Sequence, residues 1–316
     1  MTRSQMAPDP GNAATPRTLP SVDVCVCTYH RTSLFDALTS LARQDYPQDR
    51  VRVIVADNAD LSEIRQSVED TARRLGLRVD YIHAPARNIS IARNACLDAA
   101  SAPYIAFLDD DEEADANWIS ALVGRLADTG ADVVLGPVDA VYADEAPAWM
   151  KHARLHDTRP TILAGGNITT GYTCNVMMRA GVVGDLRFLP ELGRTGGEDS
   201  VFFAELHRRG ARLTYANAAR VRERVPRERE SLTWLTSRAF RTGQTHGRML
   251  LSRPGGTEWP VRATGLGLAW VKCAVCIVQA AVFIWSPAGW RRGLMRACLH
   301  AGVVSRLAGK AEIELY

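Results

Sequence analysis

Three consecutive carboxylates, Asp109, Asp110 and Asp111, are the strongest chemical signal in the sequence. They follow residues 104–108, a short apolar segment with the composition of a buried strand. Adjacent carboxylates repel one another, so a purely structural role does not favour them. Mg²⁺ and Mn²⁺ take oxygen ligands, usually one or two carboxylates together with the phosphates of a substrate. We therefore predict a divalent-metal site at Asp109 and Asp111, with Asp110 able to share the ion.

A metal ion bound to this run would serve a definite chemistry. It would neutralise the charge that develops on a departing diphosphate, which is Lewis-acid catalysis. The structural alternative is an acidic loop that caps a helix expected to begin near Ala116. Asp115 alone can supply that cap, so the three preceding carboxylates are better explained by a metal site.

A second acidic pair, Glu198 and Asp199, directly follows Gly196 and Gly197. The glycines give a flexible approach, and the carboxylates lie at the positive end of a helix expected over residues 200–209. A carboxylate there can take the proton from an attacking hydroxyl as a general base. The alternative is an N-cap in which Asp199 accepts first-turn amides. That alternative explains only one of the two acids, so we expect catalysis at this pair.

Two weaker signals lie near other expected strand ends. Asp57 follows residues 51–56 and could accept hydrogen bonds from a base or ribose, although Asp-Asn is also common turn chemistry. Arg93 and Asn94 could pair with a phosphate or with Asp109, and a helix-surface salt bridge is an equal alternative.

The elements that must position these residues alternate along the chain. Apolar segments rich in β-branched residues are separated by segments with helical period, which indicates βαβ units, an α/β class and a mostly parallel sheet. Ligands bind beyond the carboxyl ends of such strands, where Asp57 and Asp109 are expected. The expected strands are 22–27, 51–56, 79–82, 104–108 and 170–179, and the expected helices are 34–43, 61–75, 89–100, 200–209 and 233–251.

Composition excludes some function classes. The net charge of +3 over 316 residues is too small to indicate a nucleic-acid partner. Cys25 and Cys27 fall in an expected strand and Cys273 and Cys276 in an apolar run, which favours reduced thiols over a disulfide framework or a zinc site. Residues 1–20 are rich in Pro, Ala, Thr and Asn and lack the apolar core of a signal peptide, so we expect a disordered leader.

Residues 266–285 form a nearly continuous apolar segment of about the length of a bilayer-spanning helix, roughly 20 residues. Lys272 and Gln279 interrupt it, and a charge near the middle of a lone helix costs about 2.5–3.5 kcal/mol on insertion scales. The flanking arginines are Arg262, Arg291, Arg292 and Arg296. Basic residues on both sides suit a helix on an anionic leaflet. We expect association with a membrane surface ahead of a true span, and a buried or dimer-forming helix is the alternative.

Five segments, taken in order, resemble the motifs of family 2 glycosyltransferases over roughly residues 23–250. They are 27–31 (Cys-Thr-Tyr-His-Arg), 55–58 (Val-Ala-Asp-Asn), 88–94 (Asn-Ile-Ser-Ile-Ala-Arg-Asn), 107–112 (Phe-Leu-Asp-Asp-Asp-Glu) and 196–199 (Gly-Gly-Glu-Asp). An ordered set is far more specific than any one motif. The resemblance implies a GT-A fold that acts with inversion: a nucleotide-sugar-binding half at 21–136 and an acceptor half at 137–252. A helical, membrane-associating extension would follow at 253–316.

The resemblance also implies roles for individual residues. Asp57 would contact the uracil and ribose, and Asp109 the ribose or the metal. Asp111 would hold Mn²⁺ or Mg²⁺, and Asp199 would be the base, with Glu198 as a second catalytic carboxylate. Many relatives carry a His as a further ligand, where this sequence offers Glu223. The residues expected to bind substrate are Thr28, Tyr29, Arg31, Asp57, Arg93, Asp109 and Arg241, and Arg238, Arg241 and Arg248 could hold a diphosphate or form a solvated basic face.

Four further segments are similar to bacterial glucosyltransferases of succinoglycan assembly that add a β-1,4-linked glucose. They are 170–175, 225–229, 240–248 and 300–305. This likeness implies UDP-glucose as donor and a polyprenyl-diphosphate-linked oligosaccharide as acceptor. It places the enzyme at the cytoplasmic face of the bacterial inner membrane, with other exopolysaccharide assembly enzymes as possible partners.

Two other functions remain open at this point. A nucleotidyltransferase would need a glycine-rich basic loop after the first strand, and residues 28–31 contain no glycine. A dinucleotide-dependent oxidoreductase fails for the same reason. A non-catalytic scaffold of a polysaccharide assembly complex is the second alternative. The chain keeps an acidic residue at every acidic position of the motifs, which argues against a scaffold. We expect a hexosyltransferase in which a hydroxyl deprotonated by Asp199 attacks the anomeric carbon of the donor.

Overall fold

The computed structural model describes residues 19–252 and 255–313, so nearly all of the expected leader lies outside the described residues. The strands are β1 (Val22–Thr28), β2 (Val51–Asp57), β3 (Val79–His83), β4 (Tyr104–Leu108), β5 (Glu112–Ala114), β6 (Val133–Leu135), β7 (Val138–Val141), β8 (Asn175–Arg179), β9 (Leu213–Tyr215) and β10 (Val221–Arg224). The α-helices are α1 (Leu34–Ala42), α2 (Arg65–Leu75), α3 (Ile89–Ala99), α4 (Trp118–Thr129), α5 (Ala148–Ala153), α6 (Ala180–Val183), α7 (Glu198–Arg208), α8 (Leu232–Leu251), α9 (Trp259–Val282) and α10 (Gly289–Leu307). Three short 3₁₀ turns are η1 (Gln48–Arg50), η2 (Pro190–Leu192) and η3 (Arg227–Arg229).

Seven strands form the main sheet in the order β3-β2-β1-β4-β8-β6-β9. The first four are parallel, as the alternation of strands and helices predicts, whereas β8 runs antiparallel to both β4 and β6. The mostly parallel α/β fold is therefore confirmed. Because β1, β2 and β4 point the same way, their carboxyl ends place Thr28, Asp57 and Asp109 at one edge of the sheet.

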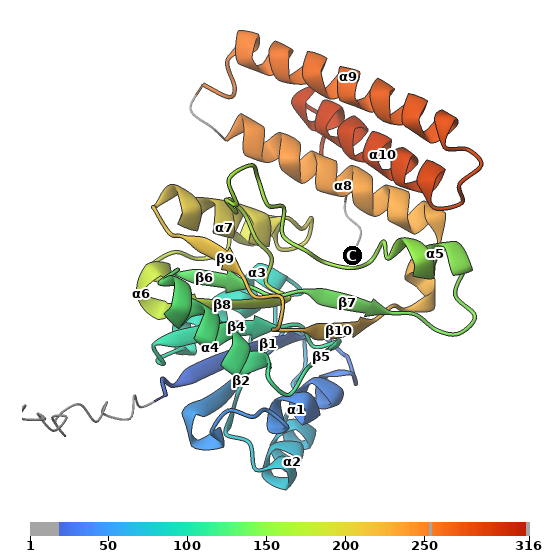
Figure 1. Ribbon diagram of the computed structural model, residues 1–316. Helices are drawn as coiled ribbons and strands as arrows, with labels where there is room; N and C mark the ends of the chain where they lie inside the picture. The colour runs from blue at the N-terminus through green and yellow to red at the C-terminus, as the bar shows by residue number, and fades with distance from the viewer. Residues whose placement is uncertain (1–18, 253–254, 314–316) are drawn as a thin grey trace, which may run out of the picture.

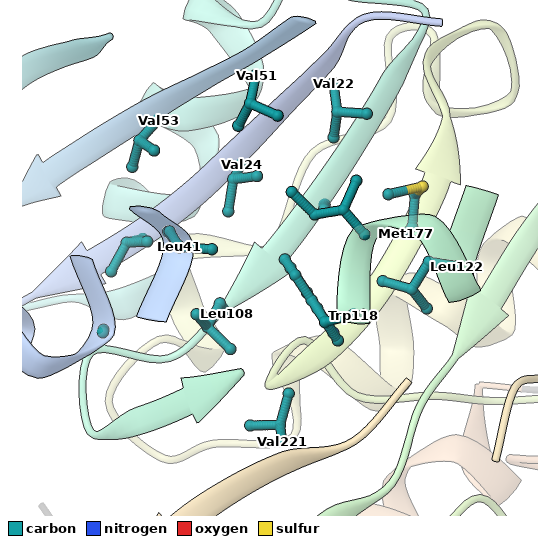
Figure 2. Close-up of a cluster of buried hydrophobic side chains, with 14 of the residues drawn as sticks. Val22, Val24, Leu41, Val51, Val53, Leu108, Trp118, Leu122, Met177 and Val221 are labelled. Carbon is teal, nitrogen blue, oxygen red and sulfur yellow. The ribbon is translucent and has the colours of Figure 1, made fainter. Parts of the chain in front are cut away.

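Helices cover both faces of this sheet, as Figure 1 shows. Alternation along β1 sends Val22, Val24 and Val26 to one face and Cys25 and Cys27 to the other. The first face packs against α1, α2 and α4, and the second against α3 and α7. Figure 2 shows the first core, where the fully buried ring of Trp118 lies among valines and leucines of the sheet and helices. These two cores fix the strand ends that carry the polar residues.

A second sheet of three strands, β5-β10-β7, lies beyond the end of β4. β5 begins at Glu112, directly after the acidic run, and pairs antiparallel with β10. The pairing sets Glu112 opposite Glu223. The small sheet therefore adds two more carboxylates beside the run.

The C-terminal helices α8, α9 and α10 stack on one another above the α/β unit, with α9 outermost (Figure 1). Gly243 and Gly302 let α8 and α10 approach closely, because a Cβ at either position would overlap a backbone carbonyl of the other helix. Arg248 of α8 pairs with Glu312 of the tail. Arg248 is therefore held within the stack by an ion pair rather than lying on a solvated face, and its expected contact with a diphosphate stays a prediction.

Two local predictions are wrong. Residues 170–174 do not pair as a strand: Gly171 packs directly on Phe203 and Thr170 donates to the Ser200 carbonyl, so β8 begins only at Asn175. Asp115 does not cap α4, whose N-cap is Asn117. The Asp115 carboxylate instead pairs with Arg222 of β10, which ties the acidic loop to the small sheet.

Candidate active site

The acidic run leaves the end of β4 with its carboxylates in different environments. Thr28, at the end of β1, donates from Oγ1 to Oδ2 of Asp110 at 2.7 Å. Arg31 Nη1 lies 3.2 Å from Asp110 Oδ1 and also pairs with Asp111. The Asp110 side chain is only 8% exposed, compared with 18% for Asp111 and 40% for Asp109. Asp110 is therefore committed to protein partners, whereas Asp109 is the most open of the three and Asp111, although less buried than Asp110, is paired with Arg31.

Burial and mutual repulsion raise the pKa values of two members of the run, Asp109 and Asp110. Burial is the main cause that lifts the pKa of Asp109 to about 7, and the neighbouring charges of Asp111 and Asp110 add to it. The Asp109 side chain keeps an open edge, yet protein surrounds the rest of it. Burial and Asp111 likewise raise the pKa of Asp110 to about 6. Concentrated negative charge of this kind favours a bound cation.

Glu112 and Glu223 extend the cluster on the side of the small sheet. Glu112 Oε2 accepts from the Asp109 amide at 3.0 Å, and burial raises the pKa of Glu112 well above its ordinary value. Arg229 Nη1 lies 2.6 Å from Glu223 Oε1, and its Nη2 lies 4.0 Å from Asp111. Glu223, the residue that the sequence offered as a third metal ligand, is thus already paired with an arginine.

The carboxylates of the acidic run fit a hard divalent cation whose coordination is completed by the phosphates of a substrate. In the part of the chain that the structure describes, no three His, Cys, Asp or Glu side chains are gathered into a ready-made metal cage. Asp109 and Asp111 nevertheless offer carboxylate oxygens. In this structure the Asp111 carboxylate forms an ion pair with Arg31. Mg²⁺ and Mn²⁺ need only one or two carboxylates when substrate phosphates complete the coordination. A cavity of about 300 Å³ opens beside Asp111 and Arg31.

The second carboxylate pair is brought to this cluster by Arg93. The Arg93 guanidinium, on α3, forms a buried ion pair with Glu198 at the start of α7. Its Nη2 also lies 3.8 Å from Oδ1 of Asp109. Arg93 is 7% exposed, so the alternative of a helix-surface salt bridge is excluded. These two carboxylates raise the pKa of Arg93 against the effect of burial.

Asp199 lies one residue further into the first turn of α7. Its Oδ1 accepts from the Ser200 amide at 2.6 Å and from the Ser200 hydroxyl at 3.3 Å, while Gly197 is the N-cap. It therefore accepts one first-turn amide without being the cap. Burial, followed by the charge of Glu198, raises the pKa of Asp199 to about 6. A carboxylate with a pKa near the working pH is suited to general-base catalysis.

The remaining predicted binding residues divide into two groups. Asp57 is buried, with Oδ1 accepting from the Ala59 amide at 3.0 Å and Oδ2 from the Tyr81 hydroxyl. Its turn role is thus real, and Tyr81 is a partner that local sequence did not indicate. Tyr29 is exposed, edge-on to the ring of His30. Asp57 thus lies buried at the end of β2, and Tyr29 lies exposed directly after the end of β1.

On the side of the C-terminal helices, a group of rings and arginines supports Arg229. His156 is stacked on Trp234 and its Nε2 lies 3.2 Å from the Arg229 carbonyl oxygen. Arg229 and Arg238 both lie over the Trp234 ring. Burial, with Arg238 nearby, lowers the pKa of His156 to about 4. Sequence reasoning gave His156 no role, and its neighbours in space could not be read from local sequence.

Comparisons with known proteins identify the relatives of this arrangement. The sequence model described as Glycosyl transferase family 2 matches residues 23–187. The succinoglycan biosynthesis protein ExoM of Rhizobium meliloti (strain 1021) is 43% identical over 298 residues, which cover 93% of this chain and 95% of that protein. The glycosyltransferase AglE of Haloferax volcanii is 26% identical over 57% of this chain and 60% of its own length.

Solved structures agree on the fold. The mannosyltransferase PcManGT from Pyrobaculum calidifontis, solved in complex with GDP-Man and Mn²⁺, has a TM-score of 0.63 and 21% identity, covering 98% of this chain and 92% of that one. Residues 1–349 of Staphylococcus aureus TarS have a TM-score of 0.54 and 18% identity, covering 92% of both chains. The chain spans 52% of the longer TarS structure. At these identities the likeness supports the GT-A architecture alone.

Proposed function

The chain belongs to glycosyl transferase family 2, and we propose that it is a metal-dependent, inverting hexosyltransferase of exopolysaccharide assembly. One observation carries the proposal. Arg93 joins the open carboxylate Asp109 to Glu198, and Asp199 follows Glu198 in the first turn of α7. A candidate metal site and a candidate base are therefore built into one site.

In the proposed reaction the acceptor hydroxyl gives its proton to the Asp199 carboxylate. Its oxygen forms a bond to the anomeric carbon as the bond from that carbon to the nucleoside diphosphate breaks, with inversion. Mn²⁺ or Mg²⁺ on Asp109 and Asp111 would supply Lewis-acid stabilisation of the departing diphosphate. Arg31 and Arg229 flank Asp111 and are placed to pair with the same anion.

The donor and acceptor are proposed from the relatives. The relative of 43% identity is named for succinoglycan biosynthesis, and the similar segments belong to enzymes that add a β-1,4-linked glucose. We therefore assign UDP-glucose as donor and a polyprenyl-diphosphate-linked oligosaccharide as acceptor. The Mn²⁺ in the structure of PcManGT with GDP-Man supports the choice of metal.

Helix α9 supports a place at the cytoplasmic face of the inner membrane. Within the described ranges it is the one helix long and apolar enough to cross a membrane, by length and composition alone. Ala269, Cys273 and Cys276 face the stack, whereas Val271 and Val278 on the opposite side are about 60% exposed. A helix packed lengthwise on α10 suits the surface of a bilayer better than a span. Residues 253–316 carry eight basic and three acidic residues, which favours an anionic leaflet.

A transfer assay on a single variant tests the proposal. Asp199→Asn keeps the size of the side chain but removes the base, so transfer of glucose to a lipid-linked acceptor should fall by about 100-fold or more while folding is retained. A wild-type chain that binds no nucleotide sugar at all would instead support the non-catalytic scaffold. Full transfer by the Asn variant would remove Asp199 from the mechanism.

A further inference from the structure

The loop that carries the candidate base depends on left-handed backbone. Gly196 has a φ of +80° and Gly197 a φ of +87°, a region that favours glycine over other residues. The chain thereby turns immediately before α7, so that Glu198 and Asp199 occupy its first turn. The place of the Asp199 carboxylate is set by whatever holds this loop.

Helix α3 holds one side of the loop. The Ile89 amide donates to the Gly193 carbonyl at 3.2 Å. One turn later, Arg93 pairs with Glu198 in a buried environment. These contacts fix the two ends of the loop and leave residues 195–197, between them, to other partners.

Helix α8 holds the other side. Arg241 Nη1 donates to the Thr195 carbonyl at 2.9 Å, and a Cβ added at Gly196 would overlap the Arg241 guanidinium. A Cβ added at Gly197 would lie 2.6 Å from Thr245 Oγ1. Residues four apart share one face of a helix, so α8 presents Arg241 and Thr245 to the loop together.

From these contacts we propose that Arg241 and Thr245 are positioning residues, through which α8 clamps the base loop against α3 and sets the place of the Asp199 carboxylate. The inference rests on the proposed function, in which Asp199 is the base. It assigns Arg241 to the loop, where the sequence had indicated a phosphate ligand. The clamp also ties the base to the helical stack, because α8 packs closely on α10, which carries α9.

Release of the clamp has two consequences for Asp199. The carboxylate moves away from the attacking hydroxyl, and a displacement of about 1 Å can cost on the order of 100-fold in rate. Water also reaches the carboxylate, which weakens the desolvation that raises its pKa. The charged and titratable groups around it are Glu198 on α7, Arg93 on α3 and the Cys174 thiol just before β8; Arg241 on α8 lies against its loop.

The test compares full-length variants with UDP-glucose, Mn²⁺ and a lipid-linked acceptor. In Arg241→Gln we expect kcat to fall by about 10- to 100-fold, the acidic limb of the pH profile to move below its wild-type position, and the calorimetric Kd for UDP-glucose to stay within about twofold. Arg241→Lys keeps a donor for the Thr195 carbonyl and should recover part of the rate. Arg248→Gln removes an arginine from the same helix but not from the loop, so it should keep the wild-type pH profile.

A second pair of variants separates position from charge. Thr245→Leu pushes a larger side chain towards Gly197 and should lower kcat without any change in charge, whereas Thr245→Ser should not. A higher Kd for UDP-glucose in Arg241→Gln, with the pH profile unmoved, would show that Arg241 binds the donor and would overturn the proposal. Wild-type kinetics in both Arg241→Gln and Thr245→Leu would overturn it as well. Full activity of Asp199→Asn would instead refute the assignment of Asp199 as the base, the part of the proposed function on which the clamp rests.

Discussion

Arg93 and Glu198 are 105 residues apart in sequence and form a buried ion pair between α3 and α7. The same guanidinium lies 3.8 Å from Asp109 at the end of β4. One arginine thus links the candidate metal site to the loop of the candidate base. Both side chains are buried, so each charge depends on its partner in place of water. The pair therefore contributes to the stability of the fold as well as to the electrostatics of the site.

Removing one member of this pair should be costly. Arg93→Met leaves Glu198 buried without its partner, and breaking a buried pair in this way costs about 3–5 kcal/mol of unfolding free energy. Glu198→Gln keeps an acceptor for Arg93 and should cost less. Urea unfolding of the two variants and of Arg93→Met/Glu198→Gln tests this. The double variant should be less destabilised than the sum of the singles, and additive losses would show that the two residues are not coupled.

The pH dependence of transfer should report Asp199. A base acts as its carboxylate, so a pKa raised to about 6 means that activity is lost as the pH falls through about 6. An unperturbed aspartate would retain activity down to about pH 4. Initial rates at saturating Mn²⁺ locate the limb. Asp185→Asn, an exposed carboxylate paired with Arg209, should leave the limb in place, and a wild-type limb near pH 4 would contradict the assignment.

Within the acidic run, Asp110 and Asp111 should behave differently. Asp110 is held by Thr28 and Arg31, so Asp110→Asn should preserve Mn²⁺-dependent donor binding and mainly change the unfolding temperature. Asp111→Asn should weaken that binding by about tenfold or more, because a charged oxygen ligand is lost. Calorimetric titration of both variants decides between them. Equal loss in both would mean that Asp110 shares the metal after all.

The apolar face of α9 can be tested with two neighbouring residues. Val278 is 61% exposed on that face, and Gln279 is rotated from it by about 100°. Val278→Glu places a charge where lipid is expected and should reduce binding to anionic vesicles by about tenfold or more. Gln279→Glu adds the same charge on the flank and should bind vesicles more nearly as the wild type does. Equal effects, or a wild-type protein that ignores vesicles, would exclude membrane binding by this face.

Local pattern was sufficient for much of the α/β unit. The strands at 22–27, 51–56, 79–82 and 104–108 and the acidic run after the last of them follow from apolar periodicity, and the structure confirms these elements within two residues. The same reasoning failed at 170–174, where packing of Gly171 on Phe203 takes the place of strand pairing. The spacing of apolar residues indicates that a segment is buried, but it does not show whether the segment pairs with a strand or packs against a helix.

The contacts that assemble the site were beyond local sequence. Arg93 could be read as a phosphate ligand or a surface ion pair, and only the fold brings Glu198 to it. Arg241 was expected to bind a diphosphate or to lie on a solvated basic face, and only the fold shows that it donates to the Thr195 carbonyl. Each of these pairs joins segments far apart in the chain. The residue pattern of one segment does not show which distant segment it will contact.

The most direct test of the central claim is calorimetric binding of UDP-glucose with and without Mn²⁺, on the wild type and on Asp111→Ala. It needs no acceptor and reports donor class and metal site together. We expect Mn²⁺-dependent binding to the wild type and its loss in Asp111→Ala, with the fold of the variant retained. Binding of UDP-glucose that is indifferent to Mn²⁺ and unchanged in Asp111→Ala would contradict a metal-dependent hexosyltransferase centred on this acidic run.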